Sequence, residues 1–277
     1  MTHPDRFFKY LAPDAALAVL TTGRFRWSSP LIFDDPAEFR RMPRFSPGLE
    51  EGLALSTSRL IDVAYGVRAV DEARLTALSK TLLLGVRGLK SSGMTRDEVI
   101  ADLGIPGAGA DAEHERRLHE FIHASGLSDV RVFCVTTDPD SPAMWEAYAA
   151  GGTGLQVELR HVPEESTALL AARKVDYAAE PPPLGSAEDF FLYGETDRLA
   201  KASLQAIIST KRQEWSYQAE WRVVWWLREP DESLYTEYPF LPQELASIRF
   251  GPRVSDEFRA AAVELARARY PHCEVLT

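Results

Sequence analysis

The segment from Glu220 to Trp226 combines polar residues with large apolar ones in the order Glu-Trp-Arg-Val-Val-Trp-Trp. This alternation is typical of a β-strand that has one buried face. The segment 211–219 leads directly into it, and the two together hold four of the six tryptophans of the chain. Glu220 is therefore expected where a loop enters a rigid strand, a position from which a carboxylate can be held firmly toward a ligand.

Similar patterns elsewhere predict an α+β fold. Strands are expected at residues 24–28, 130–135, 155–159, 221–227 and 248–250, and residues from about Leu49 to Gly126 have a helical pattern. No G-x-G-x-x-G segment occurs, which disfavours a doubly wound parallel core. We therefore predict a single domain over residues 1–277. It consists of a mixed, largely antiparallel curved sheet with flanking helices and a helical insertion at about 49–126.

Local signals predict the boundaries of several elements. Pro13 stands near the start of a helix that is expected to end at Gly23, since glycine favours the left-handed conformation of a helix C-cap. Longer helices are expected at about 187–208 and 256–270. The acidic segment 33–36 predicts a turn, because aspartate side chains there can accept hydrogen bonds from nearby backbone N–H groups.

Composition narrows the classes of partner. The chain has 277 residues with 31 basic and 41 acidic side chains, which gives a formal charge of -10. Such a charge opposes general binding to nucleic acids. No apolar run is long enough to span a bilayer, so no membrane segment is expected. The two cysteines, Cys134 and Cys273, are expected to be free thiols in a reducing cytoplasm.

One segment matches a metal-binding motif. His119-Glu120-Phe121-Ile122-His123 has the H-E-x-x-H pattern, in which two histidines on one helix face hold zinc and the glutamate acts as a general base. Asp129 is a candidate third ligand, as in a metzincin protease. However, the preceding residues look helical, and Asp129 leads at once into a strand. We therefore expect no zinc site here and keep a zinc-dependent hydrolase as an alternative.

Four separated blocks resemble the bacterial family called domain of unknown function 2971. They are residues 8–10 with 24–39, 144–149 with 154–159, Lys211 with 215–222, and 248–255. The blocks occur in the family's order and span nearly the whole chain. Asp34 stands where the family usually has asparagine, and Gln218 where glutamate is common. The resemblance implies an α+β fold and a place in bacterial anti-phage or toxin-like systems.

The third block is also similar to a motif of NAD-dependent ADP-ribosyltransferases. Gln218-x-Glu220 resembles the Q-x-E turn of that superfamily, whose late glutamate stabilises a ribosyl cation. The resemblance implies NAD as a substrate and leaves the acceptor open. It implies catalytic roles for Glu220, Tyr148 and Ser28, and cofactor-binding roles for Lys9, Tyr10, Trp145, Gln218 and Arg222. Glu220 is expected at the mouth of a pocket that Tyr10, Ser28, Trp145, Tyr148 and Arg222 line.

Two other interpretations of these residues stay open. Glu220 and Arg222 can form a salt bridge along the strand that serves only the fold. Alternatively, the aromatic and polar blocks can form a non-catalytic module that binds a nucleotide or a peptide.

Overall fold

The computed structural model describes residues 2–103, 109–124, 126–180, 183–194, 196–229 and 232–276. The chain divides into two compact units. The first, here called the sheet unit, comprises Met1–Phe39, Ser125–Ala179 and Ile208–Thr277. The second, here called the helical unit, comprises Arg40–Ala124 and Glu180–Ile207. The helical segment expected at about 49–126 falls mostly in the helical unit, which also takes residues 180–207. The single-domain organisation stays a prediction.

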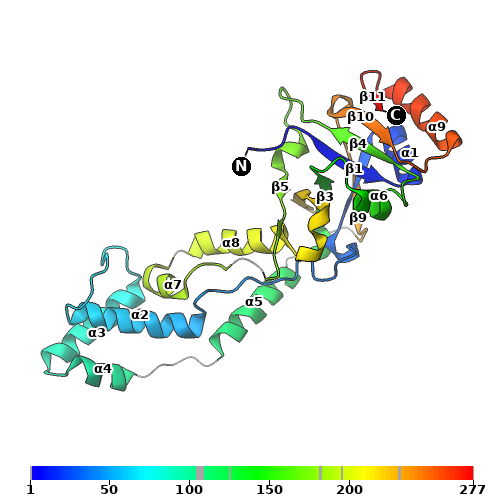
Figure 1. Cartoon of the computed structure of the whole chain (residues 1–277). Coiled ribbons are helices and arrows are strands. Elements are labelled where there is room, and N and C mark those ends of the chain that lie inside the picture. The colour runs from blue at the N-terminus through cyan, green and yellow to red at the C-terminus, as the bar shows by residue number, and fades with distance from the viewer. Residues whose placement is uncertain are drawn as a thin grey trace. The chain divides into compact units, whose positions relative to one another are not determined.

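The sheet unit is built on one mixed, mostly antiparallel sheet, as predicted (Figure 1). Its main path runs β11 (Glu274–Leu276), β10 (Leu245–Phe250), β4 (Leu155–Leu159), β1 (Phe7–Leu11), β3 (Val130–Thr136), β2 (Arg24–Ser28) and β9 (Tyr235–Pro239). The strand β8 (Glu220–Trp226) branches from β3 and also pairs with β5 (Arg173–Lys174). Within this sheet only β10 and β11 are parallel among the described pairs. A separate parallel pair joins β6 (Asp176–Tyr177) to β7 (Thr210–Lys211).

The five predicted strands are all present, with ends that differ by at most a few residues. The strand β9 was not predicted, because its burial pattern alternates only between exposed and half-buried positions. This strand pairs with β2 along its whole length, from Arg24 opposite Pro239 to Ser28 opposite Tyr235. An edge strand with no buried residue has no hydrophobic alternation that a sequence pattern could reveal.

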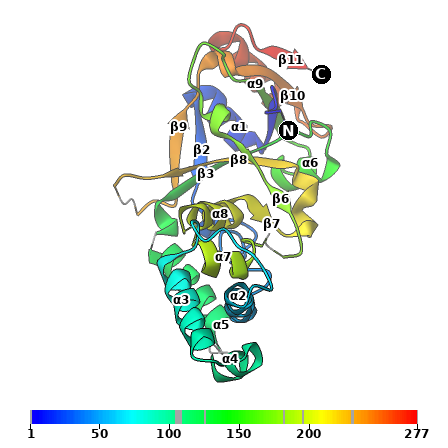
Figure 2. The same ribbon diagram turned by 90° about the vertical axis from the view of Figure 1, so that its left-hand side faces the viewer.

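Two helices lie together beside the strands of the sheet unit (Figure 2). They are α1 (Pro13–Thr22) and α9 (Asp256–Arg269). Gly23 ends α1 in the left-handed conformation, with φ of 68°, as predicted. The core beneath these helices includes Leu20, Phe25 and Leu155, which are almost completely buried. A third helix, α6 (Pro142–Tyr148), contacts β1.

The strands next to the core separate an aromatic face from a polar face. On β2, Phe25 and Trp27 belong to the core, whereas Arg26 and Ser28 point to the other side. On β3, Phe133 stacks on Trp27 with ring centroids 5.4 Å apart. Because side chains alternate along a strand, the polar residues of β2 and β3 share the face opposite this aromatic cluster. That polar face carries the candidate site.

The helical unit contains α2 (Leu49–Ala64), α3 (Ala77–Ser91), α4 (Arg96–Leu103), α5 (Ala110–Ala124), α7 (Ala187–Tyr193) and most of α8 (Thr196–Ser209). Its core includes Leu60, Leu83 and Val99. The helix predicted at 187–208 is interrupted, because Gly194 ends α7 with φ of 85°. No helix in the described part of the chain is long and apolar enough to cross a membrane.

At Gly154 the backbone passes very close to another backbone segment of the sheet unit. A Cβ at this position would lie 2.0 Å from the carbonyl oxygen of Leu11. We predict that Gly154→Ala lowers the free energy of unfolding of the sheet unit by about 1–3 kcal/mol, because the backbone must shift. Urea denaturation followed by circular dichroism measures this. Gly88→Ala is the control, since a Cβ there meets nothing within 4 Å. Equal stability of the two variants would contradict the prediction.

Candidate functional site

A cavity of about 280 Å³ lies on the polar face of the sheet unit. Six of the residues that the sequence singled out line it together: Lys9, Tyr10, Ser28, Tyr148, Gln218 and Glu220. Other residues also line it, among them Asp34, Glu38, Cys134, Thr136, Lys211 and Trp215. Blocks separated by up to about two hundred residues in the sequence thus meet at one pocket of the sheet unit.

The strand β3 explains why these blocks meet. It pairs with β8 along its length, and Thr136 lies opposite Glu220. Thr136 is also the partner of Phe8 on β1, and Val132 is the partner of Ser28 on β2. One strand therefore holds β1, β2 and β8 in register around the pocket.

A left-handed residue joins Gln218 to Glu220. Ala219 has φ of 40° and ends the short helix η4 (Gln213–Gln218), and β8 begins at the next residue. A non-glycine residue in this region costs about 1–3 kcal/mol and persists where its surroundings fix it. The carbonyl oxygen of Ala219 accepts a hydrogen bond from the N–H of Thr137 at 3.3 Å. The N–H of Glu220 donates to the hydroxyl of Tyr177 at 2.8 Å. This turn directs both side chains to the pocket.

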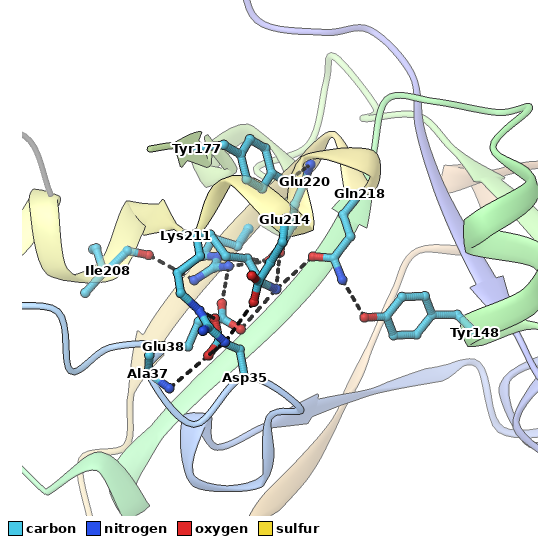
Figure 3. A network of polar contacts seen from close by, with 12 residues as sticks. Asp35, Ala37, Glu38, Tyr148, Tyr177, Ile208, Lys211, Glu214, Gln218 and Glu220 are labelled. Carbon is cyan, nitrogen blue, oxygen red and sulfur yellow. Dashed lines mark hydrogen bonds and ion pairs between the residues drawn. The ribbon is translucent and has the colours of Figure 1, made fainter. Parts of the chain in front are cut away.

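The ammonium group of Lys211 lies at the centre of a buried polar network (Figure 3). It pairs with Glu38 Oε2 at 3.0 Å and with Glu220 Oε2 at 3.2 Å. It also donates to Gln218 Oε1 at 2.7 Å. An ammonium group has three donors, and all three are used here. Lys211 is thereby fixed in position and in charge.

The guanidinium group of Arg222 joins the same two carboxylates on their other side. Its Nη2 lies 2.5 Å from Glu38 Oε1 and 2.7 Å from Glu220 Oε1, and its Nε donates to Glu220 Oε1 at 2.9 Å. Its Nη1 donates to the carbonyl oxygen of Ile208 at 3.2 Å. Two cations and two anions thus form a closed cluster with no net charge. All four side chains are at most 6% exposed.

Arg222 and Trp145 do not line the pocket, which corrects two of the sequence predictions. The Arg222 side chain is 0% exposed and lies behind Glu220, so its guanidinium is committed to carboxylates and is not presented to a pyrophosphate. Trp145 packs edge-on against Tyr10, with ring centroids 4.9 Å apart. It supports a residue of the pocket wall. The sequence pattern predicted the strand that carries Arg222 and the helix that carries Trp145, but it could not predict how deeply the two side chains are buried.

The pKa values of the two carboxyl groups of the cluster are shifted in opposite directions. Burial alone would raise the pKa of Glu220, but Arg222 and Lys211 outweigh burial, and the pKa lies below its ordinary value. Burial dominates at Glu38 and raises its pKa in spite of Arg222. Glu220 is therefore held as a carboxylate at neutral pH. A fixed anion of this kind stabilises positive charge in a ligand.

Lys9 also borders the pocket on β1, but its side chain points to the core face that Phe7 and Leu11 share, and its partner on β4 is the core residue Val157. Its ammonium donates to the carbonyl oxygen of Cys134 at 2.7 Å and lies 4.9 Å from the ring centre of Phe133. Burial lowers the pKa of Lys9, while Cys134 and Glu220 act in the opposite direction. The amine of Lys9 is thus packed against the aromatic face of the sheet, and a contact between Lys9 and a cofactor stays a prediction.

Glu38 is the functional candidate that sequence reasoning missed. It follows the predicted acidic turn, in which Asp35 Oδ1 accepts a hydrogen bond from the N–H of Ala37 at 2.9 Å. Asp35 also pairs with Arg212 at 3.0 Å, and Arg212 is the neighbour of Lys211. The turn therefore brings Glu38 to the cluster. The available signal was the acidic turn itself, but its partner lay far away in the sequence.

The H-E-x-x-H segment gives no metal site that the described residues support. No group of three His, Cys, Asp or Glu side chains is placed to hold a metal there. Glu120 is exposed and pairs with Arg116. Asp129 belongs to the sheet unit and His119 to the helical unit. The His123 side chain lies outside the described residues, so the absence of zinc stays a prediction.

No protein-family model, curated protein or solved structure matches this chain. The family resemblance therefore stays a prediction.

The Lys211 cluster predicts an unusual dependence of stability on pH. Lys211→Met leaves two buried carboxylates with only Arg222 between them, which should lower the free energy of unfolding by about 3–5 kcal/mol at pH 7. The folded-state pKa of Glu38, which burial already raises in the wild type, rises further in the variant because a neighbouring cation is lost. The penalty is then present at neutral pH and shrinks as the pH falls through that raised pKa.

Urea denaturation of wild type and variant between pH 4.5 and pH 8, interpreted with the linkage relation, measures this dependence. Lys174→Met is the control, because Lys174 is exposed on β5. A stability difference that stays constant over this pH range would contradict the assignment of Lys211 to the two carboxylates.

Proposed function

We propose that this protein cleaves the N-glycosidic bond of NAD and transfers the ADP-ribosyl group to an acceptor. The observation that carries the proposal is the meeting of Ser28, Tyr148 and Glu220 at one pocket, with Glu220 held as a buried carboxylate. These are the three residues to which the resemblance assigns catalysis.

The chemistry requires a fixed negative charge beside the ribose. As the bond between the anomeric carbon and the nicotinamide nitrogen breaks, its electron pair stays on nicotinamide and positive charge develops on the ribose. An acceptor then forms the new bond to the anomeric carbon and loses a proton. Glu220 is suited to stabilise this charge because Lys211 and Arg222 hold its carboxylate in place before the reaction begins.

The pocket suits part of a dinucleotide. Its volume of about 280 Å³ lies just below the usual range for small-molecule sites, so one nucleoside half fits better than the whole molecule. Tyr148, Trp215 and Phe33 supply aromatic surface for a planar base.

The acceptor and the biological setting belong to the same proposal. The family resemblance supports action in bacterial anti-phage defence or in a toxin-like system. Two free cysteines suit a cytoplasmic location. The pocket itself does not distinguish water from a macromolecular acceptor.

The decisive variant is Glu220→Gln. It removes the anion but keeps the side-chain shape, so release of nicotinamide from labelled NAD should fall by at least about a hundredfold. The cluster would gain one net positive charge, and some loss of stability is expected as well. Circular dichroism checks that the variant is folded under the assay conditions.

Ser28→Ala keeps the proposal testable if Glu220→Gln does not fold. The Ser28 hydroxyl makes no hydrogen bond within the described part of the chain, so its removal should cost little stability. We expect slower nicotinamide release from this variant at unchanged thermal stability. Full activity of a folded Glu220→Gln variant would refute the catalytic assignment. Binding of NAD by wild type without any cleavage would favour the binding module instead.

A further inference from the structure

The side chain of Gln218 has only one orientation that suits its neighbours. Its Oε1 lies 2.7 Å from the ammonium group of Lys211, and an ammonium group can only donate. The oxygen of the amide must therefore face Lys211, and the amide nitrogen must face the other way. That nitrogen lies 2.6 Å from the hydroxyl oxygen of Tyr148 (Figure 3).

The orientation of Gln218 determines the role of the Tyr148 hydroxyl. An amide nitrogen donates, so the Tyr148 oxygen accepts in this contact and its own proton points elsewhere. No acceptor in the described part of the chain takes that proton. Burial raises the pKa of Tyr148 above its usual range, so the hydroxyl keeps its proton at neutral pH. Tyr148 lines the pocket and is half-buried.

From this chain of contacts we infer that Lys211 and Gln218 make Tyr148 a hydrogen-bond donor toward the pocket, so that the ligand places an acceptor atom beside it. Tyr148 is then a specificity-determining residue, and Gln218 is a positioning residue that acts through it. The inference rests on the proposed function for the identity of the ligand. A carbonyl oxygen such as that of a nicotinamide carboxamide is an acceptor of the required kind.

Glutamine and glutamate at position 218 would have opposite effects on the Tyr148 hydroxyl. A glutamate at 218 has no donor at neutral pH, so it would accept the proton of Tyr148. The hydroxyl would then offer only lone pairs to the pocket. Gln218→Glu and Tyr148→Phe thus remove the same donated proton by two different routes.

The test is a double-mutant cycle with carba-NAD, in which a carbocycle replaces the ribose so that no oxocarbenium ion can form. Tyr148→Phe and Gln218→Glu should each weaken its binding by about five- to tenfold, the scale of one hydrogen bond. The double variant should be no weaker than either single one, because the shared proton is lost only once. Tyr217→Phe is the control, since this neighbouring tyrosine lies outside the pocket lining.

Effects that multiply in the double variant, or wild-type affinity of Gln218→Glu, would overturn the inference. A second measurement needs no ligand. In ligand-free protein with ¹⁵N-labelled glutamine side chains, Tyr148→Phe should shift the amide proton resonances of Gln218, because one of these protons loses its acceptor. Unchanged resonances would mean that Tyr148 does not accept from Gln218. If wild type fails to bind carba-NAD while the resonances do shift, the proposed function fails and the donor role of Tyr148 stands.

Discussion

The buried ammonium group of Lys211 is the interaction on which the candidate site depends. It lies on the short strand β7 and bonds to the loop that carries Glu38, to the helix η4 through Gln218 and to β8 through Glu220. Without the two carboxylates, burial would favour the neutral amine. Without the amine, the carboxylates would repel each other. Each member is therefore held in place because the others are present.

A buried cluster of four charged groups is an inefficient way to stabilise a fold. Removing four charged groups from water has a large desolvation cost, and packed apolar residues of similar volume can give equal or greater stability. The cluster does, however, hold Glu220 as an anion and orient Gln218 at a pocket wall. The cluster can therefore serve both the fold and the pocket through the same residues.

The sequence could predict elements whose signal is local. The alternation from Glu220 to Trp226 gave the strand, and Gly23 gave the end of α1. The strand β9 lacked a buried face and gave no such signal. Glu38 shows why the site was harder to predict, since it bonds to Arg222 from 184 positions away. Residues of that separation meet only because β3 aligns β1, β2 and β8, and no short pattern contains this information.

The spacing of residues in the sequence also cannot predict how deeply each side chain is buried. Glu220 and Arg222 lie two positions apart on one strand and face the same side, as the alternation predicted, yet one lines the pocket and the other lies behind it. The difference arises because the loop with Glu38 covers Arg222. This loop turns a potential ligand-binding cation into a support for Glu220. The polarity of the pocket is thus set by which charges the fold covers, and a ligand meets donors and acceptors whose positions were fixed before it arrived.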